Sequence, residues 1–82
     1  MIRLTLDTAD PRAPVVRVEG TLDAPGAAAL RQLLADARPA AVDLAGVGSI
    51  DEHGRAALVA ARGEGVALLA PSLFIRTLLE EA

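Results

Sequence analysis

The residues that could carry chemistry are gathered in one short segment, Gly46–Gly54. This segment holds Ser49, Asp51, Glu52 and the only histidine of the chain, His53. A serine, a histidine and an acid can form a nucleophilic triad, and histidine with carboxylates can bind a metal ion. Successive residues of a helix turn by about 100°, however, so Asp51, Glu52 and His53 would diverge. We therefore expect no catalytic residue, no metal site and no enzyme; acids at a solvated helix start, where the helix dipole favours them, are sufficient to explain the pattern.

Two loop motifs that bind cofactors or activate nucleophiles are incomplete. Gly46 and Gly48 supply the first two glycines of G-x-G-x-x-G, but Asp51 stands at the third, where its carboxylate would repel a phosphate. A nucleophile elbow around Ser49 needs glycine on both sides, and Val47 and Asp51 stand there instead. All eight basic residues are arginine, which excludes a P-loop lysine and a Schiff base. The sequence predicts no cofactor.

Composition limits the remaining possibilities. The chain has 82 residues, of which 52% are apolar, and it contains no cysteine. This predicts one domain, residues 1–82, without disulfides or thiolate metal sites. A net charge of −3, scattered arginines and a single aromatic residue, Phe74, argue against nucleic acid. No segment is apolar enough for membrane insertion, so we expect a cytoplasmic protein, with Phe74 in the core or at its edge.

Periodicity predicts seven elements in the order β-β-α-β-α-β-α. The expected strands are 2–7, 15–19, 40–44 and 66–70, with a glycine-rich connection at 46–50. Asp23, Asp51 and Ser72 are the expected N-caps of three helices, the first ending at Pro39 and the second near Arg62. We expect an α/β fold with a four-stranded mixed sheet: the first two strands antiparallel, strands two to four parallel, and the helices on one face. The other face and an edge strand are left for water or a partner.

Three segments carry a family resemblance. Val15–Asp23 contains a strand followed by G-x-L-D, Val42–Gly54 is similar to D-L-x-x-V-x-x-I-D-S-S-G, and Val66–Ser72 ends in x-P-S. In this order they resemble the STAS domain, the family of sulphate-transporter tails and anti-sigma-factor antagonists. The resemblance implies a STAS-like fold and agrees with the predicted topology. It also implies a shortened C-terminus, since family members usually continue with a further strand and helix.

The resemblance places a partner-binding surface at the start of the second helix. Its candidate residues are Gly48, Ser49, Asp51, Glu52, His53 and Gly54. In anti-sigma-factor antagonists, the second serine of D-S-S-G is phosphorylated by a partner kinase that is itself the anti-sigma factor. Glu52 and His53 occupy the two serine positions here, so no phosphorylation is expected, and Ser49 lies four residues too early to replace the acceptor.

Three interpretations of this departure remain open. Glu52 is a fixed negative charge that locks one state, or His53 is itself phosphorylated or a pH-dependent contact, or the domain binds without a phosphoswitch. The implied partner is an anti-sigma factor or GHKL-type kinase. The alternative is the ATPase of an ABC-type lipid transporter, of which the chain would be an accessory subunit. A shortened domain also exposes apolar surface, which favours a constitutive partner or a homodimer.

Overall fold

The computed structural model describes residues 2–80. Met1, Glu81 and Ala82, at the ends of the expected domain, lie outside the described residues. The elements follow the predicted order: β1 (Ile2–Asp7), β2 (Val15–Leu22), α1 (Ala24–Ala37), β3 (Ala41–Ile50), α2 (Glu52–Gly63), β4 (Ala67–Leu69) and α3 (Leu73–Glu80).

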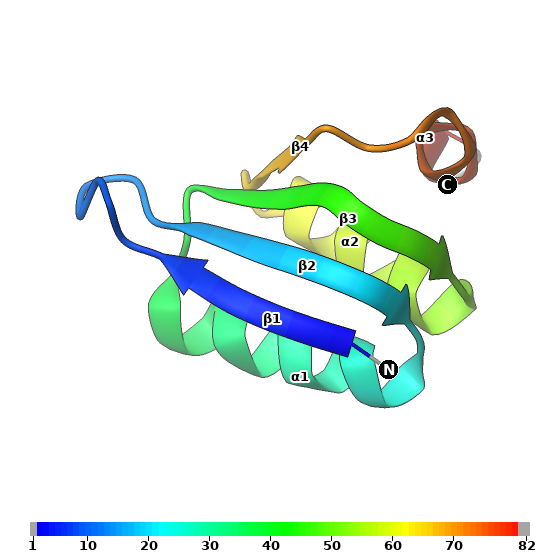
Figure 1. Ribbon diagram of the computed structural model, residues 1–82, viewed down its shortest axis with the longest axis horizontal. Helices are drawn as coiled ribbons and strands as arrows, with labels where there is room; N and C mark the ends of the chain where they lie inside the picture. Colours follow the sequence, from blue (N-terminus) through cyan, green and yellow to red (C-terminus); the bar gives the residue numbers. More distant parts are fainter. Residues whose placement is uncertain (1, 81–82) are drawn as a thin grey trace.

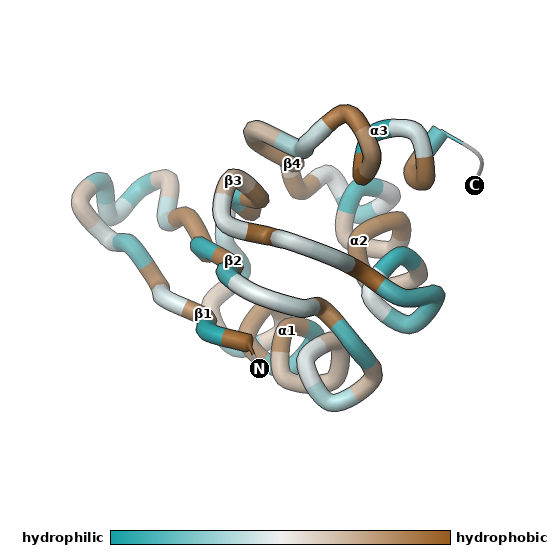
Figure 2. The backbone as a smooth tube through the Cα atoms, turned by 45° about the vertical axis from the view of Figure 1, so that its right-hand side comes forward, coloured by the Kyte–Doolittle hydropathy of each residue, from teal (hydrophilic) through white to brown (hydrophobic). Residues whose placement is uncertain are grey.

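The four strands form one mixed sheet with the order β1-β2-β3-β4 (Figure 1). β1 is antiparallel to β2, whereas β2, β3 and β4 are mutually parallel. This confirms the predicted sheet. α1 and α2 connect the parallel strands and cover one face, and α3 lies beside α2, next to β3 and β4 (Figures 1 and 2).

The core lies between this face and the helices and consists of aliphatic side chains. β2 and β3 contribute residues at alternating positions, α1 contributes Leu30 and α2 contributes Leu58, both fully buried. The other members of the cluster are Val16, Val18, Leu22, Val42, Leu44, Val47, Ile75 and Leu79. Within residues 2–80, no helix is both long and apolar enough to cross a bilayer.

The glycine-rich segment 46–50 is part of a strand, so the predicted connection is wrong. β3 continues to Ile50 because its second half pairs with an equally extended β2, with Gly20 beside Val47 and Leu22 beside Ile50. Gly20, the expected end of the second strand, lies inside β2 at a register shift, with a φ of 98° that favours glycine. β4 is shorter than predicted, with only three residues.

α3 packs on α2 through one narrow face. Ile75 and Leu79 are buried, and the Ile75 backbone N–H donates to the Ser72 hydroxyl, which confirms this N-cap. The guanidinium groups of Arg55 and Arg62, both on α2, donate to the carbonyl oxygens of Leu78 and Leu79 at 2.8 and 3.3 Å.

Phe74 does not join the core. Its side chain is 58% exposed, beside Leu73 at 79%. A residue next to Ile75 is turned by about 100° from the buried face of the helix. The expectation of a core or core-edge position for Phe74 is therefore wrong.

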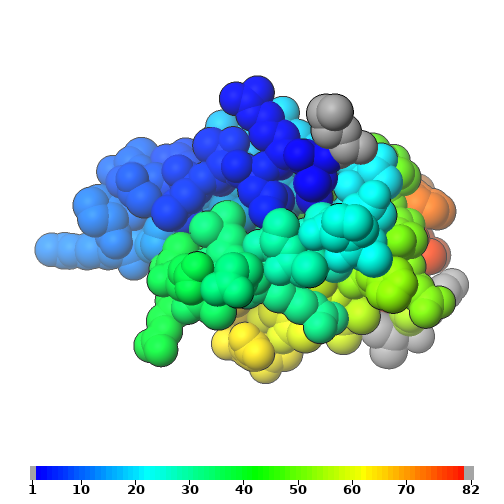
Figure 3. Space-filling model, turned by 90° about the horizontal axis from the view of Figure 1, so that it is seen from below, coloured from blue at the N-terminus to red at the C-terminus, as the bar shows by residue number. Residues whose placement is uncertain are grey.

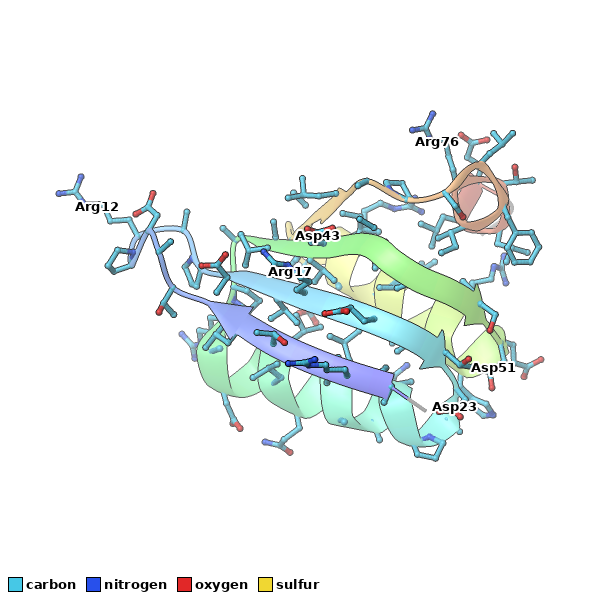
Figure 4. The ribbon with its side chains drawn as sticks, in the orientation of Figure 1. Arg12, Arg17, Asp23, Asp43, Asp51 and Arg76 are labelled. Carbon is cyan, nitrogen blue, oxygen red and sulfur yellow. The ribbon has the colours of Figure 1, made fainter. Side chains whose placement is uncertain are left out.

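The opposite face of the sheet is polar. Arg17 of β2 lies between Asp7 of β1, at 3.4 Å, and Asp43 of β3, at 3.9 Å (Figure 4). The Ser49 hydroxyl donates to the Thr21 hydroxyl on the neighbouring strand at 3.2 Å. These side chains are partly exposed, so the ion pairs contribute little to folding free energy.

Core packing predicts a contrast between two leucines. Leu58→Ala removes a side chain with no exposed surface, whereas Leu73→Ala truncates one that is 79% exposed. We expect the first to lower the free energy of unfolding by about 2–5 kcal/mol and the second by less than about 0.5 kcal/mol. Urea denaturation followed by circular dichroism measures both. Equal losses would contradict this description of the core.

Candidate functional site

The candidate site lies at one end of the sheet, where α1 and α2 begin. Because β2 and β3 are parallel and each leads directly into a helix, both helix starts occupy the same edge of the sheet. Figure 4 shows Asp23 and Asp51 side by side there. The predicted fold thus brings the start of α1 next to the segment that the sequence singles out.

Asp51 organises the start of α2. Its carboxylate accepts a hydrogen bond from the Gly54 backbone N–H at 3.0 Å, and its own backbone N–H donates to the Leu22 carbonyl at 3.2 Å. Asp23 caps α1 in the same way by accepting from the Gly26 backbone N–H at 3.1 Å. Both predicted N-caps are confirmed, and both carboxylates satisfy backbone donors that a helix start otherwise leaves unpaired.

Gly54 lies beneath the site rather than on its surface. The residue is buried, and a Cβ atom added there would collide with the Leu22 carbonyl oxygen and would lie 2.9 Å from Leu22 Cγ. Only a residue without a side chain allows the first turn of α2 to approach β2 this closely. The structure therefore shows a packing role for this predicted site residue.

Glu52 and His53 are exposed at the rim of a shallow groove between α1 and α2. The groove has a volume of about 250 Å³ and is lined by Ala24, Ala27, Ala28, Arg31, Glu52, His53 and Ala56. It combines small apolar side chains with charges of both signs. Figure 3 views the molecule from the side on which α1 faces the reader.

Ser49 lies apart from this groove. It is the exposed residue near the end of β3 whose hydroxyl bonds to Thr21 on the polar sheet face. Gly48 is likewise exposed on β3. The structure thus places Glu52 and His53 at the groove, Asp51 before them as the cap of α2, and Gly48 and Ser49 on the adjoining strand.

Arg31 and three alanines of α1 line the groove, but the sequence analysis did not predict them as site residues. The signal was present in the predicted topology, because consecutive parallel strands place the first turns of their helices side by side. Arg31 lies two turns into α1, on the side turned toward α2. It gives the groove a positive charge in addition to the negative charge of Glu52.

The polar side chains at this end of the sheet do not converge on one another. Ser49 bonds to Thr21, and no hydrogen bond joins it to His53 among the described residues. In residues 2–80, no group of three or more His, Cys, Asp or Glu side chains is arranged to hold a metal ion. What this surface offers is a set of exposed charges beside an alanine-lined groove.

Comparisons with known proteins give one family match and two structures with a similar fold. The family model described as "Mlab, STAS domain" matches residues 5–82. The solved structure of the anti-sigma factor antagonist SpoIIAA in its unphosphorylated form is similar, with a TM-score of 0.73 and 16% identity over 98% of this chain and 84% of that one. A crystal structure of a protein called Mglu gives a TM-score of 0.67 and 22% identity, over 84% of this chain and 20% of that one. No curated protein sequence matches the chain.

Two glycines of α2 provide a test of the packing beneath the site. Gly54→Ala forces a methyl group against the Leu22 backbone, whereas Gly63→Ala adds one where no atom lies within 4 Å. We expect the first to lower the free energy of unfolding by about 1–3 kcal/mol. The second should leave it unchanged or raise it by up to about 1 kcal/mol. Thermal or urea unfolding measures both, and a tolerated Gly54→Ala would disprove the close approach.

Proposed function

Because the chain belongs to the STAS domain family, we propose that it is a non-catalytic protein-interaction module that binds a regulatory kinase or anti-sigma factor. The observation that carries this proposal is the start of α2, where Asp51, Glu52 and His53 are consecutive and all exposed. The fold shared with an anti-sigma factor antagonist supports it.

The proposed contact surface includes the exposed residues that the sequence singles out. Gly48 and Ser49 contribute the end of β3, and Asp51, Glu52 and His53 contribute the first turn of α2. Gly54 shapes this surface from beneath. The groove beside it adds Arg31, so a matching partner would present a basic group toward Glu52 and an acidic group toward Arg31.

We propose that binding is not controlled by phosphoserine. The position that the resemblance assigns to the acceptor is His53, and Glu52 precedes it. Neither side chain has a hydroxyl group. Glu52 instead places a permanent negative charge on the first turn of α2, where the helix dipole stabilises it. Ser49 is held on β3 by Thr21, away from this turn.

The missing hydroxyl also favours a second candidate function. A subunit that stays bound to its partner needs no phosphate to release it. The chain would then be an accessory subunit of an ABC-type lipid transporter and would bind the ATPase through the same surface. The two candidates differ in the partner recovered, since one is a kinase or anti-sigma factor and the other is a transporter ATPase.

Charge reversal at the two ends of α2 tests the location of the surface. Glu52→Lys changes the start of the helix, and Glu64→Lys, at the exposed C-cap, is the matched control at its other end. The tagged domain is used to capture its partner from its own cells, and the affinity of the purified pair is then measured by calorimetry. We expect Glu52→Lys to weaken binding at least about tenfold, which is about 1.4 kcal/mol, and Glu64→Lys to leave it within about threefold. Equal effects would move the surface away from the α2 start.

A second experiment separates the switched from the permanent partner. Glu52→Ser/His53→Ser places hydroxyl groups at both positions of the motif. If the partner is a kinase of the anti-sigma type, we expect this variant to gain phosphate on incubation with the partner and ATP, and to lose affinity when it does. The unchanged protein serves as the control and should gain none at these positions. If the captured partner is a transporter ATPase and the variant remains unmodified, the accessory-subunit function is supported instead.

A further inference from the structure

The outer edge of β1 is the longer of the two open edges of the sheet. Since the order is β1-β2-β3-β4, the edges belong to β1, with six residues, and to β4, with three. β1 pairs with β2 without a register shift, and no described segment covers it on the outside (Figure 3). A regular, uncovered edge presents unpaired backbone donors and acceptors to another strand.

The side chains of β1 differ between its two faces. Arg3, Thr5 and Asp7 lie on the polar face, where Asp7 contacts Arg17 and Arg3 stands opposite Glu19. Ile2, Leu4 and Leu6 lie on the helix side. Ile2 and Leu4 pack against the core, but Leu6 remains 40% exposed.

The polar face near this edge carries more negative than positive charge. Within residues 2–80, Arg17 is the only cation paired with Asp7 and with Asp43, and Asp7 keeps a side-chain exposure of 39%. A cation supplied from outside β1 would give Asp7 a second partner. A neighbouring strand with an acidic residue opposite Asp7 would be repelled, and one with an uncharged residue there would leave Asp7 without this second partner.

β1 is complementary to itself in one antiparallel register. When two copies are centred on Thr5, Arg3 faces Asp7 of the second copy and Leu4 faces Leu6. Both charge pairs then lie on the polar face, and the leucine pairs lie on the helix side. If one β1 strand were shifted along the other by one residue, the polar face of one sheet would join the apolar face of the other. A shift by four residues would place Arg3 opposite Arg3 in one direction and Asp7 opposite Asp7 in the other.

We propose that the outer edge of β1 binds β1 of a second copy, which joins the two sheets across a twofold axis at Thr5. On the polar face, charges then alternate from Asp43 to Arg17, Asp7 and Arg3 of the second copy. On the other face, the exposed part of Leu6 is covered. β2 separates this edge from β3, which leads into α2, so the dimer leaves the proposed partner surface free.

A single cysteine tests the register. The chain contains none, so Thr5→Cys introduces the only thiol. In the proposed register the two substituted residues face each other with Cα atoms about 4.5–5.5 Å apart, within disulfide range. We expect rapid formation of a covalent dimer under mild oxidation. Thr21→Cys, on the polar face of the inner strand β2, is the control. Cross-linking of Thr5→Cys no faster than of Thr21→Cys would overturn the proposal.

Charge exchange tests the complementarity without a covalent bond. Arg3→Asp and Asp7→Arg each set like charges against one another across the axis, whereas the double variant restores opposite charges. By sedimentation velocity, we expect the unchanged chain to form a dimer and each single variant to dissociate at least about tenfold more readily. The double variant should recover only in part, because Asp7→Arg also sets a like charge beside Arg17 within the chain. Circular dichroism confirms that each variant is folded. A monomer at every concentration, or a dimer that Arg3→Asp leaves intact, would disprove the proposal.

Discussion

The contact between the first turn of α2 and the backbone of Leu22 determines where the functional surface lies. The Leu22 carbonyl accepts the Asp51 backbone N–H, and Gly54 leaves no side chain between helix and strand. The next residue, Asp23, caps α1. The peptide unit between Leu22 and Asp23 therefore positions the starts of both helices. The alanine-lined groove and its charged rim follow from this approach, because a larger residue at position 54 would push α2 away from β2.

Much of this arrangement could be predicted from the sequence because it depends on local chemistry. Asp23 and Asp51 cap helices through hydrogen bonds to residues three positions later, and such spacing is visible without coordinates. The alternation of residues 2–7 and 15–19 predicts the first strand pair in the same way. Two helices between three strands then require parallel pairing, which places the candidate residues of α2 at the end of the sheet.

The features that the sequence did not predict depend on tertiary contacts. Gly46 and Gly48 favour a loop when taken alone, yet they lie in β3 because β2 offers a partner along its whole length. Phe74 has the large apolar side chain of a typical core residue, but the buried face of α3 is formed by Ile75 and Leu79. Nothing in the sequence distinguishes Arg31 from the other seven arginines. Only the packing of α1 beside α2 places it in the groove.

The attachment of α3 has a consequence for how the domain opens. This helix buries Ile75 and Leu79, and its last carbonyl groups are held by Arg55 and Arg62 from α2 rather than by its own turns. It adds no strand pairing to the sheet, so its loss breaks few contacts compared with unfolding the whole chain. We therefore expect α3 to open as a separate unit, with a lower opening free energy than the sheet and with backbone amides that exchange with solvent before those of β2 and β3.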